Sequence, residues 1–404
     1  MVSNMDGAPI KELTGGINQR ALRNYNERLI LSVLQRFGPT AGSDLARMTR
    51  LSAQTVSNIM RKLEADAVVM RGAPVKGRVG KPSVPMQLNP DGAFAVGLKL
   101  GRRSADAALL DLCGEVRAQR TLAYKAPAPE EVFSFLKDAL HMFCDGLAPK
   151  LRPRVCGIGV ATPYEFWQWL DQVNLDHGAH SGWQHIEFQS EIAAFSDMPV
   201  FVVNDATAAC RAEHLYGRGK EFDDYAYFFV GTYIGGGIVL DENVYEGKKG
   251  NAGALGSMRS TGPQGESRQL VDVASLHLLF ARLEAAGISP RVLNESPDDW
   301  SKWARYVDPW LGQTAQELAK ASLSASSVID FEAILIDGAF PADVRQQLAE
   351  RTQRYITNQD TRGLVPPRVE SGTVGRNARA IGAAAAPLFS QFFLNKNTGF
   401  SERS

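Results

Sequence analysis

The stretch YAYFFVGTYIGGGIVLDENVYEG, residues 225–247, decides the fold. An aromatic and apolar run precedes its glycines, and a β-branched run follows them. Both runs have the length and composition of strands, and the glycine-rich segment between them is typical of a tight turn. The stretch therefore predicts two neighbouring strands joined by a glycine-rich turn.

The same pattern occurs once before, from residue 93 onward. Short β runs are followed by a helical segment at 130–147 and then by an alternation of strands and helices that ends near His214. A run of strands followed by alternating helices and strands thus occurs twice in the chain. This repeat predicts two related α/β lobes with a cleft between them. The β runs are FAVGLKLG (94–101), DAALLDL (106–112), VRAQRTLAY (116–124), VCGIGVATP (155–163) and PVFVVND (199–205).

The first 90 residues predict a different module. Apolar residues at helical spacing from Asn26 to Phe37 indicate one helix, Ser43 is the expected cap of a second, and Ser52 is the expected cap of a third. The third helix has an apolar inner face and a polar outer face. A short turn between two such helices is typical of a helix-turn-helix that reads base edges, although a solvated face of a small helical bundle has the same pattern. The inner residues are Val56, Ile59, Met60 and Leu63; the candidate DNA contacts are Gln54, Thr55, Ser57, Asn58 and Arg61.

A basic, turn-rich segment then favours a wing. GAPVKGRVGKP, residues 72–82, lies between two short β runs, and its candidate phosphate contacts are Lys76, Arg78 and Lys81. The predicted organisation is a flexible arm at 1–20, a winged helix-turn-helix at 21–90 and a two-lobed body at 91–404.

Charge is segregated between these parts. The chain of 404 residues has 44 basic and 44 acidic side chains. Residues 1–90 contain 13 Lys/Arg and 6 Asp/Glu, a net charge of +7, so the remainder carries −7. A basic N-terminal module on an acidic body is typical of a DNA reader joined to a domain of another function.

The four cysteines are far apart and have no C-x-x-C spacing, which favours reduced, buried thiols. Neither a signal peptide nor an apolar run long enough to cross a membrane is evident. We therefore expect a cytoplasmic protein with no membrane partner.

Three further stretches resemble the ROK family, named for its repressors, open reading frames and sugar kinases. They are VFVVNDATAACRAE (200–213), VGTYIGGGIVLDENVYEGKKGNAGALGSM (230–258) and SGTVGRNARAIGAAAAPLF (371–389). The resemblance implies an actin-like, ribonuclease-H-like two-lobed α/β body behind the winged helix-turn-helix. It also implies the repressor branch, a homo-oligomer of at least two chains that assembles through the body, and double-stranded operator DNA as partner.

Kinases of that family open with a D-x-G-G-T-K turn that holds magnesium and nucleotide phosphates. Here the matching positions carry Lys99, Arg102 and Arg103, so a metal ligand is lost and side chains crowd the phosphate position. We expect no phosphotransfer, no cofactor and a solvated turn, with attraction of an anion by the basic cluster as the alternative for the turn. A sugar kinase with a fused DNA-binding domain is the alternative.

The family's sugar site is also altered. In the family, one motif supplies a Glu that binds sugar hydroxyls and a His; the matching positions here are Ala254 and Ser257. The cysteines of the family's zinc segment are also absent, so no metal is expected. The candidate effector contacts are Asn204, Asp205, Asn174, Tyr164 and Trp183. Helix capping is the alternative for the Asn-Asp pair, and core packing is the alternative for the tryptophan.

These features predict a transcriptional regulator, a repressor of carbohydrate uptake or catabolism genes. A sugar or polyol effector would bind between the lobes. A DNA-binding protein whose former sugar site is empty is a further possibility.

Overall fold

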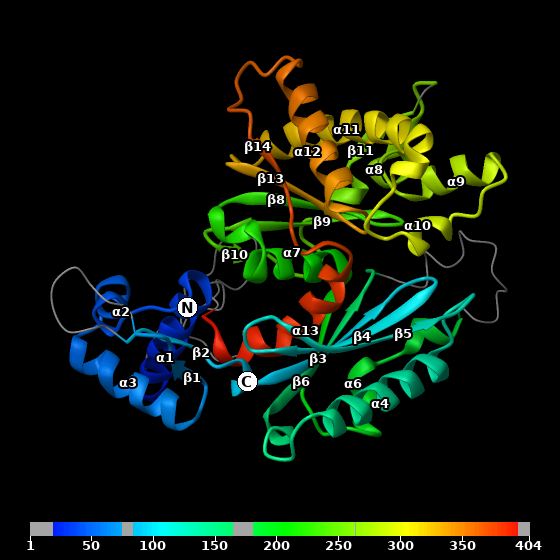
Figure 1. The fold of residues 1–404 in the computed structure, drawn as a ribbon. Coiled ribbons are helices and arrows are strands. Elements are labelled where there is room, and N and C mark those ends of the chain that lie inside the picture. Colours follow the sequence, from blue (N-terminus) through cyan, green and yellow to red (C-terminus); the bar gives the residue numbers. More distant parts are fainter. Residues whose placement is uncertain (1–18, 75–83, 165–180, 263, 395–404) are drawn as a thin grey trace, which may run out of the picture.

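The computed structural model describes residues 19–74, 84–164, 181–262 and 264–394. Figure 1 shows three parts: a small helical unit, and two sheet-containing lobes with helices between them.

The N-terminal domain, residues 19–88, has three helices and a two-stranded antiparallel sheet, as predicted. Val69 pairs with Leu88, and Thr40 forms an isolated bridge with Met86. The elements are α1 (Gln19–Phe37), α2 (Gly42–Thr49), α3 (Ala53–Ala65), β1 (Val69–Arg71) and β2 (Met86–Leu88).

Two expected helix starts were wrong. Helix α1 begins at Gln19, inside the expected arm, because its first residues are good helix formers that show no apolar periodicity. Helix α2 begins at Gly42 after Ala41, whose carbonyl accepts from the Leu45 N–H, so Ser43 is already helical and is not the cap. Residues 1–18 lie outside the described residues.

The two lobes have equivalent sheets. Lobe 1 has the strand order β5-β4-β3-β6-β7, and lobe 2 has β10-β9-β8-β13-β14. In each sheet three antiparallel strands are followed by two parallel ones, so the predicted duplication is confirmed. Lobe 1 comprises β3 (Phe94–Leu100), β4 (Ser104–Asp111), β5 (Val116–Ala123), α4 (Pro129–Gly146), β6 (Val155–Thr162), α6 (Phe188–Ala193) and β7 (Val200–Asn204).

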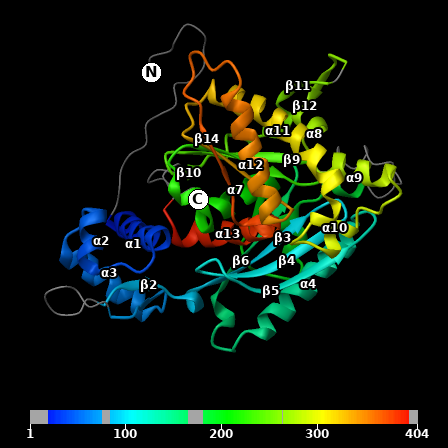
Figure 2. The same cartoon turned by 45° about the horizontal axis from the view of Figure 1, so that its top comes forward.

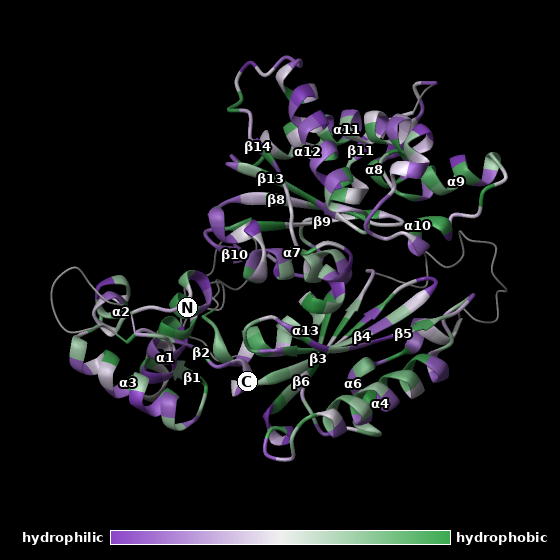
Figure 3. Cartoon of the chain, in the orientation of Figure 1, coloured by the Kyte–Doolittle hydropathy of each residue, from purple (hydrophilic) through white to green (hydrophobic). Residues whose placement is uncertain are grey.

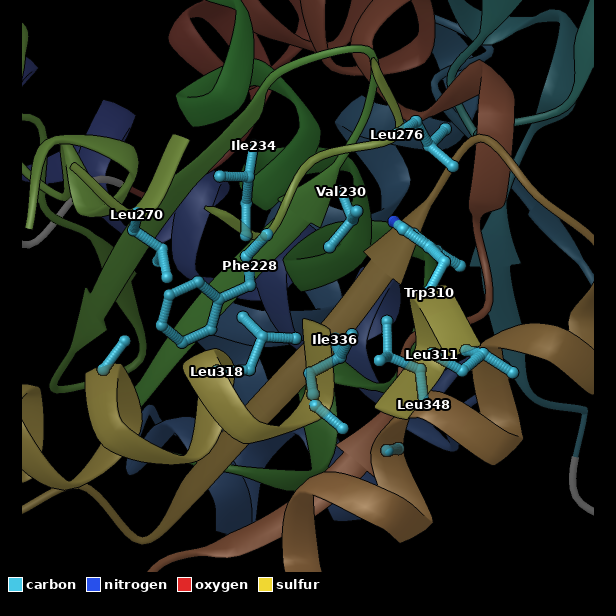
Figure 4. Packing of buried hydrophobic residues seen from close by; sticks show 14 of the residues in the cluster. Phe228, Val230, Ile234, Leu270, Leu276, Trp310, Leu311, Leu318, Ile336 and Leu348 are labelled. Carbon is cyan, nitrogen blue, oxygen red and sulfur yellow. The ribbon is translucent and has the colours of Figure 1, made fainter. Parts of the chain in front are cut away.

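Lobe 2 adds helices on its sheet. Its core, centred on Phe228, Ile336 and Trp310, fills the space between the sheet and those helices (Figure 4). The elements are β8 (Tyr225–Val230), β9 (Ile234–Leu240), β10 (Asn243–Val244), β11 (Arg259–Thr261), β12 (Ser267–Gln269), α8 (Leu270–Val273), α9 (His277–Ala285), α10 (Val292–Glu295), α11 (Ala304–Ser326), β13 (Ala333–Gly338), α12 (Ala342–Thr357) and β14 (Arg368–Ser371).

Helices α7 (Asp205–Tyr216) and α13 (Ala378–Phe392) lie between the lobes. A Cβ on Gly382 of α13 would lie 1.7 Å from the carbonyl oxygen of Ala208 in α7, and one on Gly159 of β6 would lie 1.8 Å from the carbonyl oxygen of Ala383. Glycine at these positions therefore allows α13 to touch both its neighbours backbone to backbone. In Figure 3 most of α13 is coloured hydrophobic, whereas α12 shows many hydrophilic residues.

The far end of α13 shares a core with the N-terminal domain. Ile30 and Leu34 of α1 belong to the same buried cluster as Leu388 and Phe393. Figures 1 and 2 both place α1 beside this end of α13.

All four cysteines are free, but only Cys210 is buried: Cys144 and Cys156 are half-buried and Cys113 is exposed, which corrects the expectation that the thiols are buried. None of the helices in the described part of the chain is long and apolar enough to cross a membrane.

Candidate functional site

Helix α3 presents a polar face to solvent. Its inner residues are at most 8% exposed, as predicted, while Gln54, Ser57, Asn58 and Arg61 are exposed and Thr55 is half-buried. The Ser52 hydroxyl accepts the Thr55 N–H at 3.1 Å, so this predicted cap is confirmed. The five candidate DNA contacts thus share one accessible helix. Lys76, Arg78 and Lys81 lie outside the described residues.

The N-terminal domain is also held to the body by polar contacts. Arg36 lies 3.1 Å from the Glu242 carboxylate, and the Lys220 ammonium donates to the Gln35 carbonyl at 3.2 Å. The Leu394 N–H, just beyond α13, donates to the Ser32 hydroxyl at 2.9 Å. A shift of α13 or of the β9–β10 turn would therefore act directly on α1.

A cavity of about 240 Å³ lies at the carboxyl ends of β6 and β7 in lobe 1, beside the loop that follows β10 of lobe 2. Of the candidate effector contacts, Asn204, Tyr164 and Trp183 line it, and Asn174 lies outside the described residues. The other lining residues are Thr162, Pro163, Ile186, Phe188, Val202, Val203, Thr207, Glu246, Lys249 and Gly250.

Asn204 combines the capping and binding interpretations. Its side-chain oxygen accepts the N–H groups of Ala206 and Thr207 at 3.0 and 3.2 Å, which starts α7. Its amide nitrogen has no hydrogen bond to any described residue. Asn204 can therefore offer a cavity ligand two donors without loss of the cap.

Trp183 is part of the lobe 1 core. It is 4% exposed, its indole nitrogen donates to the Pro127 carbonyl at 2.8 Å, and its ring stacks on Phe188 with centroids 6.0 Å apart. Because the indole N–H is already used, Trp183 offers the cavity only an apolar surface.

Asp205 lies next to this cavity, in a larger cleft of about 1190 Å³ between the lobes. Its carboxylate is paired with Arg379 of α13 at 3.1 Å, and the Arg379 guanidinium lies 4.9 Å from the centre of the Phe229 ring. The acid is therefore anchored to α13.

Lys99 of the altered motif is not solvated, contrary to expectation, whereas Arg103 in the turn after β3 is exposed. Lys99 is 8% exposed, and its ammonium lies 2.9 Å from the carboxylate of Asp106, its cross-strand partner on β4. Burial, with help from nearby Arg379, lowers the pKa of Lys99. The motif comparison missed this pair because Asp106 lies on the next strand, outside the motif.

Arg102 connects the two lobes. Its guanidinium lies 3.7 Å from the centre of the Tyr233 ring, on the turn between β8 and β9, and Tyr233 stacks on His277 at 5.1 Å. This contact joins the turn that matches the kinase D-x-G-G-T-K motif to the glycine-rich turn between β8 and β9.

Sequence reasoning missed Arg379, Glu246 and Lys249. Arg379 lies 174 residues from its partner Asp205 in the sequence, and only the fold of α13 brings the two together. Glu246 and Lys249 follow β10 in a loop with no pattern that indicates a pocket.

A winged helix-turn-helix followed by an actin-like, sugar-kinase-like two-lobed body is the class of protein that this fold defines. Residues 95–267 match the ROK family, and residues 23–69 match the winged helix-turn-helix DNA-binding family. The chain therefore has a ROK family domain and an N-terminal winged helix-turn-helix.

Several known proteins are similar along much of the chain. A protein of Sinorhizobium fredii named y4fQ is 28% identical over 92% of this chain and 92% of its own length. The xylose repressor of Bacillus subtilis is 26% identical over 60% of this chain, and the match spans only 62% of the repressor. The regulator NagC of Escherichia coli is 23% identical over 78% of this chain and 76% of its own.

Solved structures agree on the fold. A ROK family transcriptional regulator, described as a homologue of the Escherichia coli MLC protein, superposes with a TM-score of 0.65 at 23% identity and covers 92% of this chain and 97% of its own. A ROK glucokinase from Streptomyces griseus has a TM-score of 0.56 at 19% identity, over 72% and 98%.

Proposed function

We propose that this protein is a repressor of carbohydrate uptake or catabolism genes that binds operator DNA through α3 and the wing. One observation carries the proposal. The N-terminal domain shares a buried core with one end of α13, and the other end of α13 holds Asp205 beside the cavity. The match to the DNA-binding family and the relatives named as repressors support it.

The cavity favours a small sugar or polyol as effector. Asn204, Glu246 and Lys249 offer donors and acceptors, while Trp183 and Phe188 offer apolar surface of the kind on which sugar rings pack. An effector that changed the closure of the lobes would displace α13 and, through the shared core, α1. Because α1 begins at Gln19, the domain bounds that we propose are 1–18, 19–90 and 91–404. The last of these domains also forms the oligomer.

We further propose that the protein does not transfer phosphate. The general base of a ROK kinase corresponds to Asp205, which is paired here with Arg379, and Lys99 replaces a magnesium ligand. Arg102 joins the turn that matches the kinase motif to the glycine-rich turn between β8 and β9. An enzymatic rate of ATP-dependent hexose phosphorylation by the purified protein would support the alternative of a kinase with a fused DNA-binding domain.

We also propose that the protein acts in the cytoplasm.

The DNA-binding part of the proposal is tested with the exposed arginine of α3. We expect Arg61→Gln to weaken binding to DNA from upstream of the protein's own gene by about tenfold, because a lost base or phosphate contact costs about 1–3 kcal/mol. Fluorescence anisotropy over a range of salt concentrations measures this.

The matched control is Arg354→Gln, an exposed arginine on α12. Equal affinities for the two variants, or an affinity that does not fall with salt, would remove α3 from the DNA interface.

The effector part is tested by thermal shift across sugars and polyols. We expect one compound to raise the melting temperature. For Tyr164→Ala, at the cavity, we expect the same rise to need an effector concentration at least threefold higher. Tyr355→Ala, similarly exposed on α12, is the control. If no compound raises the melting temperature, the former sugar site binds nothing in that set and effector control is not supported.

A further inference from the structure

The segment 241–250 of lobe 2 connects the cavity with the N-terminal domain. It begins at the turn between β9 and β10, where the Glu242 carboxylate lies 3.1 Å from the guanidinium of Arg36, in the last turn of α1. Its later part contains Glu246 and Lys249, which line the cavity. One short piece of chain therefore touches the candidate effector site at one end and the DNA-binding domain at the other.

The turn at the start of this segment has a strained backbone. Asp241 and Glu242 have φ angles of 49° and 61°, a left-handed conformation that is unfavourable for residues with a side chain. Two hydrogen bonds hold the turn: the Asp241 N–H donates to the Asp224 carboxylate at 2.8 Å, and the Glu242 N–H donates to the Asp223 carbonyl at 3.0 Å. Glycine and asparagine are the usual residues in such a hairpin turn. Here the strained positions are acidic, and one of them pairs with Arg36.

The contact with lobe 2 differs in kind from the other attachments of the N-terminal domain. Towards lobe 1 and α13 the domain shares a buried apolar core, and Arg154, directly before β6, donates to the Asp91 carbonyl of the linker at 2.7 Å. Towards lobe 2, Arg36 faces the partly exposed carboxylates of Asp223 and Glu242 at 3.6 and 3.1 Å. A partly exposed ion pair contributes much less stability than a buried apolar core. The contact with lobe 2 can therefore open while the domain stays on lobe 1.

The cavity end of the segment is fixed to α7. The Glu246 carboxylate forms an ion pair with Arg211, a residue of α7 that is 5% exposed. Only β10 and Tyr245 separate Glu246 from the turn, and the Tyr245 N–H donates to the Ile238 carbonyl of β9 at 2.8 Å. A cavity ligand that binds Glu246 competes with Arg211 for its carboxylate. A displacement of Glu246 then reaches the turn through a short, paired strand.

We propose that the segment 241–250 is a latch. Glu242 holds the DNA-binding domain on lobe 2 while Glu246 is paired with Arg211, and a cavity ligand that engages Glu246 releases the domain. The inference rests on the proposed function, because it describes how the cavity regulates DNA binding, and it adds a path separate from α13. With the latch open, α1 and α3 have several orientations. DNA binding then weakens, because a smaller fraction of the molecules is in the binding-competent state.

Hydrogen-exchange mass spectrometry on the full chain, with neither DNA nor effector, tests the latch. We expect Glu242→Gln to raise the exchange rate of amides in the last turn of α1 at least about threefold, since glutamine keeps the size of the side chain but loses the charge that binds Arg36. Glu246→Gln, at the cavity end, should raise the exchange rate of the same amides. Lys248→Gln, at an exposed position of the same segment, should exchange like the unaltered chain.

The second readout is affinity for DNA from upstream of the protein's own gene. Loss of a negative charge by itself strengthens DNA binding slightly, whereas an open latch predicts that Glu242→Gln binds DNA at least about threefold more weakly. Glu350→Gln, at an exposed position of α12, removes the same charge and is the control.

Three outcomes overturn the proposal: α1 exchanges in Glu242→Gln as in Glu350→Gln, Glu246→Gln leaves the exchange of α1 unchanged, or Glu242→Gln binds DNA as tightly as the control. Absence of DNA binding by the unaltered chain would instead contradict the proposed function, and in that case the exchange rates alone decide whether the latch exists.

Discussion

Asp205 lies where the family's kinases place a general base, but here its carboxylate accepts a hydrogen bond from Arg379 at 3.1 Å. The ion pair occupies the carboxylate and ties the binding region to α13. We therefore expect the same residue type at the same position to have a different role, because one arginine from a distant helix lies beside it.

A second buried residue, His214, gives a prediction about pH. Burial, and then Arg36 of the N-terminal domain, lower its pKa to about 4 from an ordinary 6.5. The unfolded chain then binds more protons than the folded one between these values, so stability falls as pH falls below 6.5. At pH 5 the loss amounts to about 2 kcal/mol of unfolding free energy.

Urea unfolding at pH 7.5 and pH 5.0 measures this. Between the two pH values, we expect the unfolding free energy of His214→Gln to fall by about 2 kcal/mol less than that of the unaltered chain. Other charged groups near His214 are Arg211 and Glu242, and they remain in both proteins. The same loss in both would show that His214 is not responsible.

At the scale of elements, α13 decides how the parts are connected. It contacts the lobe 1 sheet, α7 and the N-terminal domain, and it carries Arg379 near its beginning. Its sequence ARAIGAAAAPLFSQF consists mainly of small residues, which allow backbone contact on two sides.

We expect Gly382→Ala to destabilise the protein by about 3 kcal/mol, because the new methyl group would overlap the Ala208 carbonyl and two helices would have to separate. Gly312→Ala is the matched control: it lies inside α11, its Cβ would meet nothing within 4 Å, and alanine is the better helix former. Chemical denaturation measures both. A Gly382→Ala variant as stable as the control would mean that the α7–α13 contact is looser than described.

Much of the secondary structure could be predicted from short stretches of the sequence. The strands of both lobes and the inner face of α3 follow from apolar periodicity, which burial imposes residue by residue. The start of α1 could not be predicted that way, since its first turns lack an apolar stripe. The partners of Asp205 and Lys99 could not be predicted either. Arg379 and Asp106 contact them through tertiary packing and strand pairing, which a short motif does not reveal.

At the scale of the whole molecule, the charge pattern and the packing divide the chain differently. Charge separates a basic N-terminal module from an acidic body, but the described residues form one core across that boundary. Ile30 in α1 is fully buried in the cluster that also contains Leu388 and Phe393. A shared core couples the stability of its two sides.

This coupling can be measured because all six tryptophans lie beyond residue 160, in the body. Their fluorescence therefore reports unfolding of the body alone. We expect Ile30→Ala, in the N-terminal domain, to lower the unfolding free energy seen by tryptophan fluorescence by about 2–5 kcal/mol, the usual effect of a core cavity. Leu22→Ala, at an exposed position of the same helix, should leave it unchanged. If Ile30→Ala changes only the helical circular dichroism and leaves the fluorescence midpoint in place, the N-terminal domain unfolds by itself. A displacement of α13 would then have to act on α1 through polar contacts, such as the one between Leu394 and Ser32.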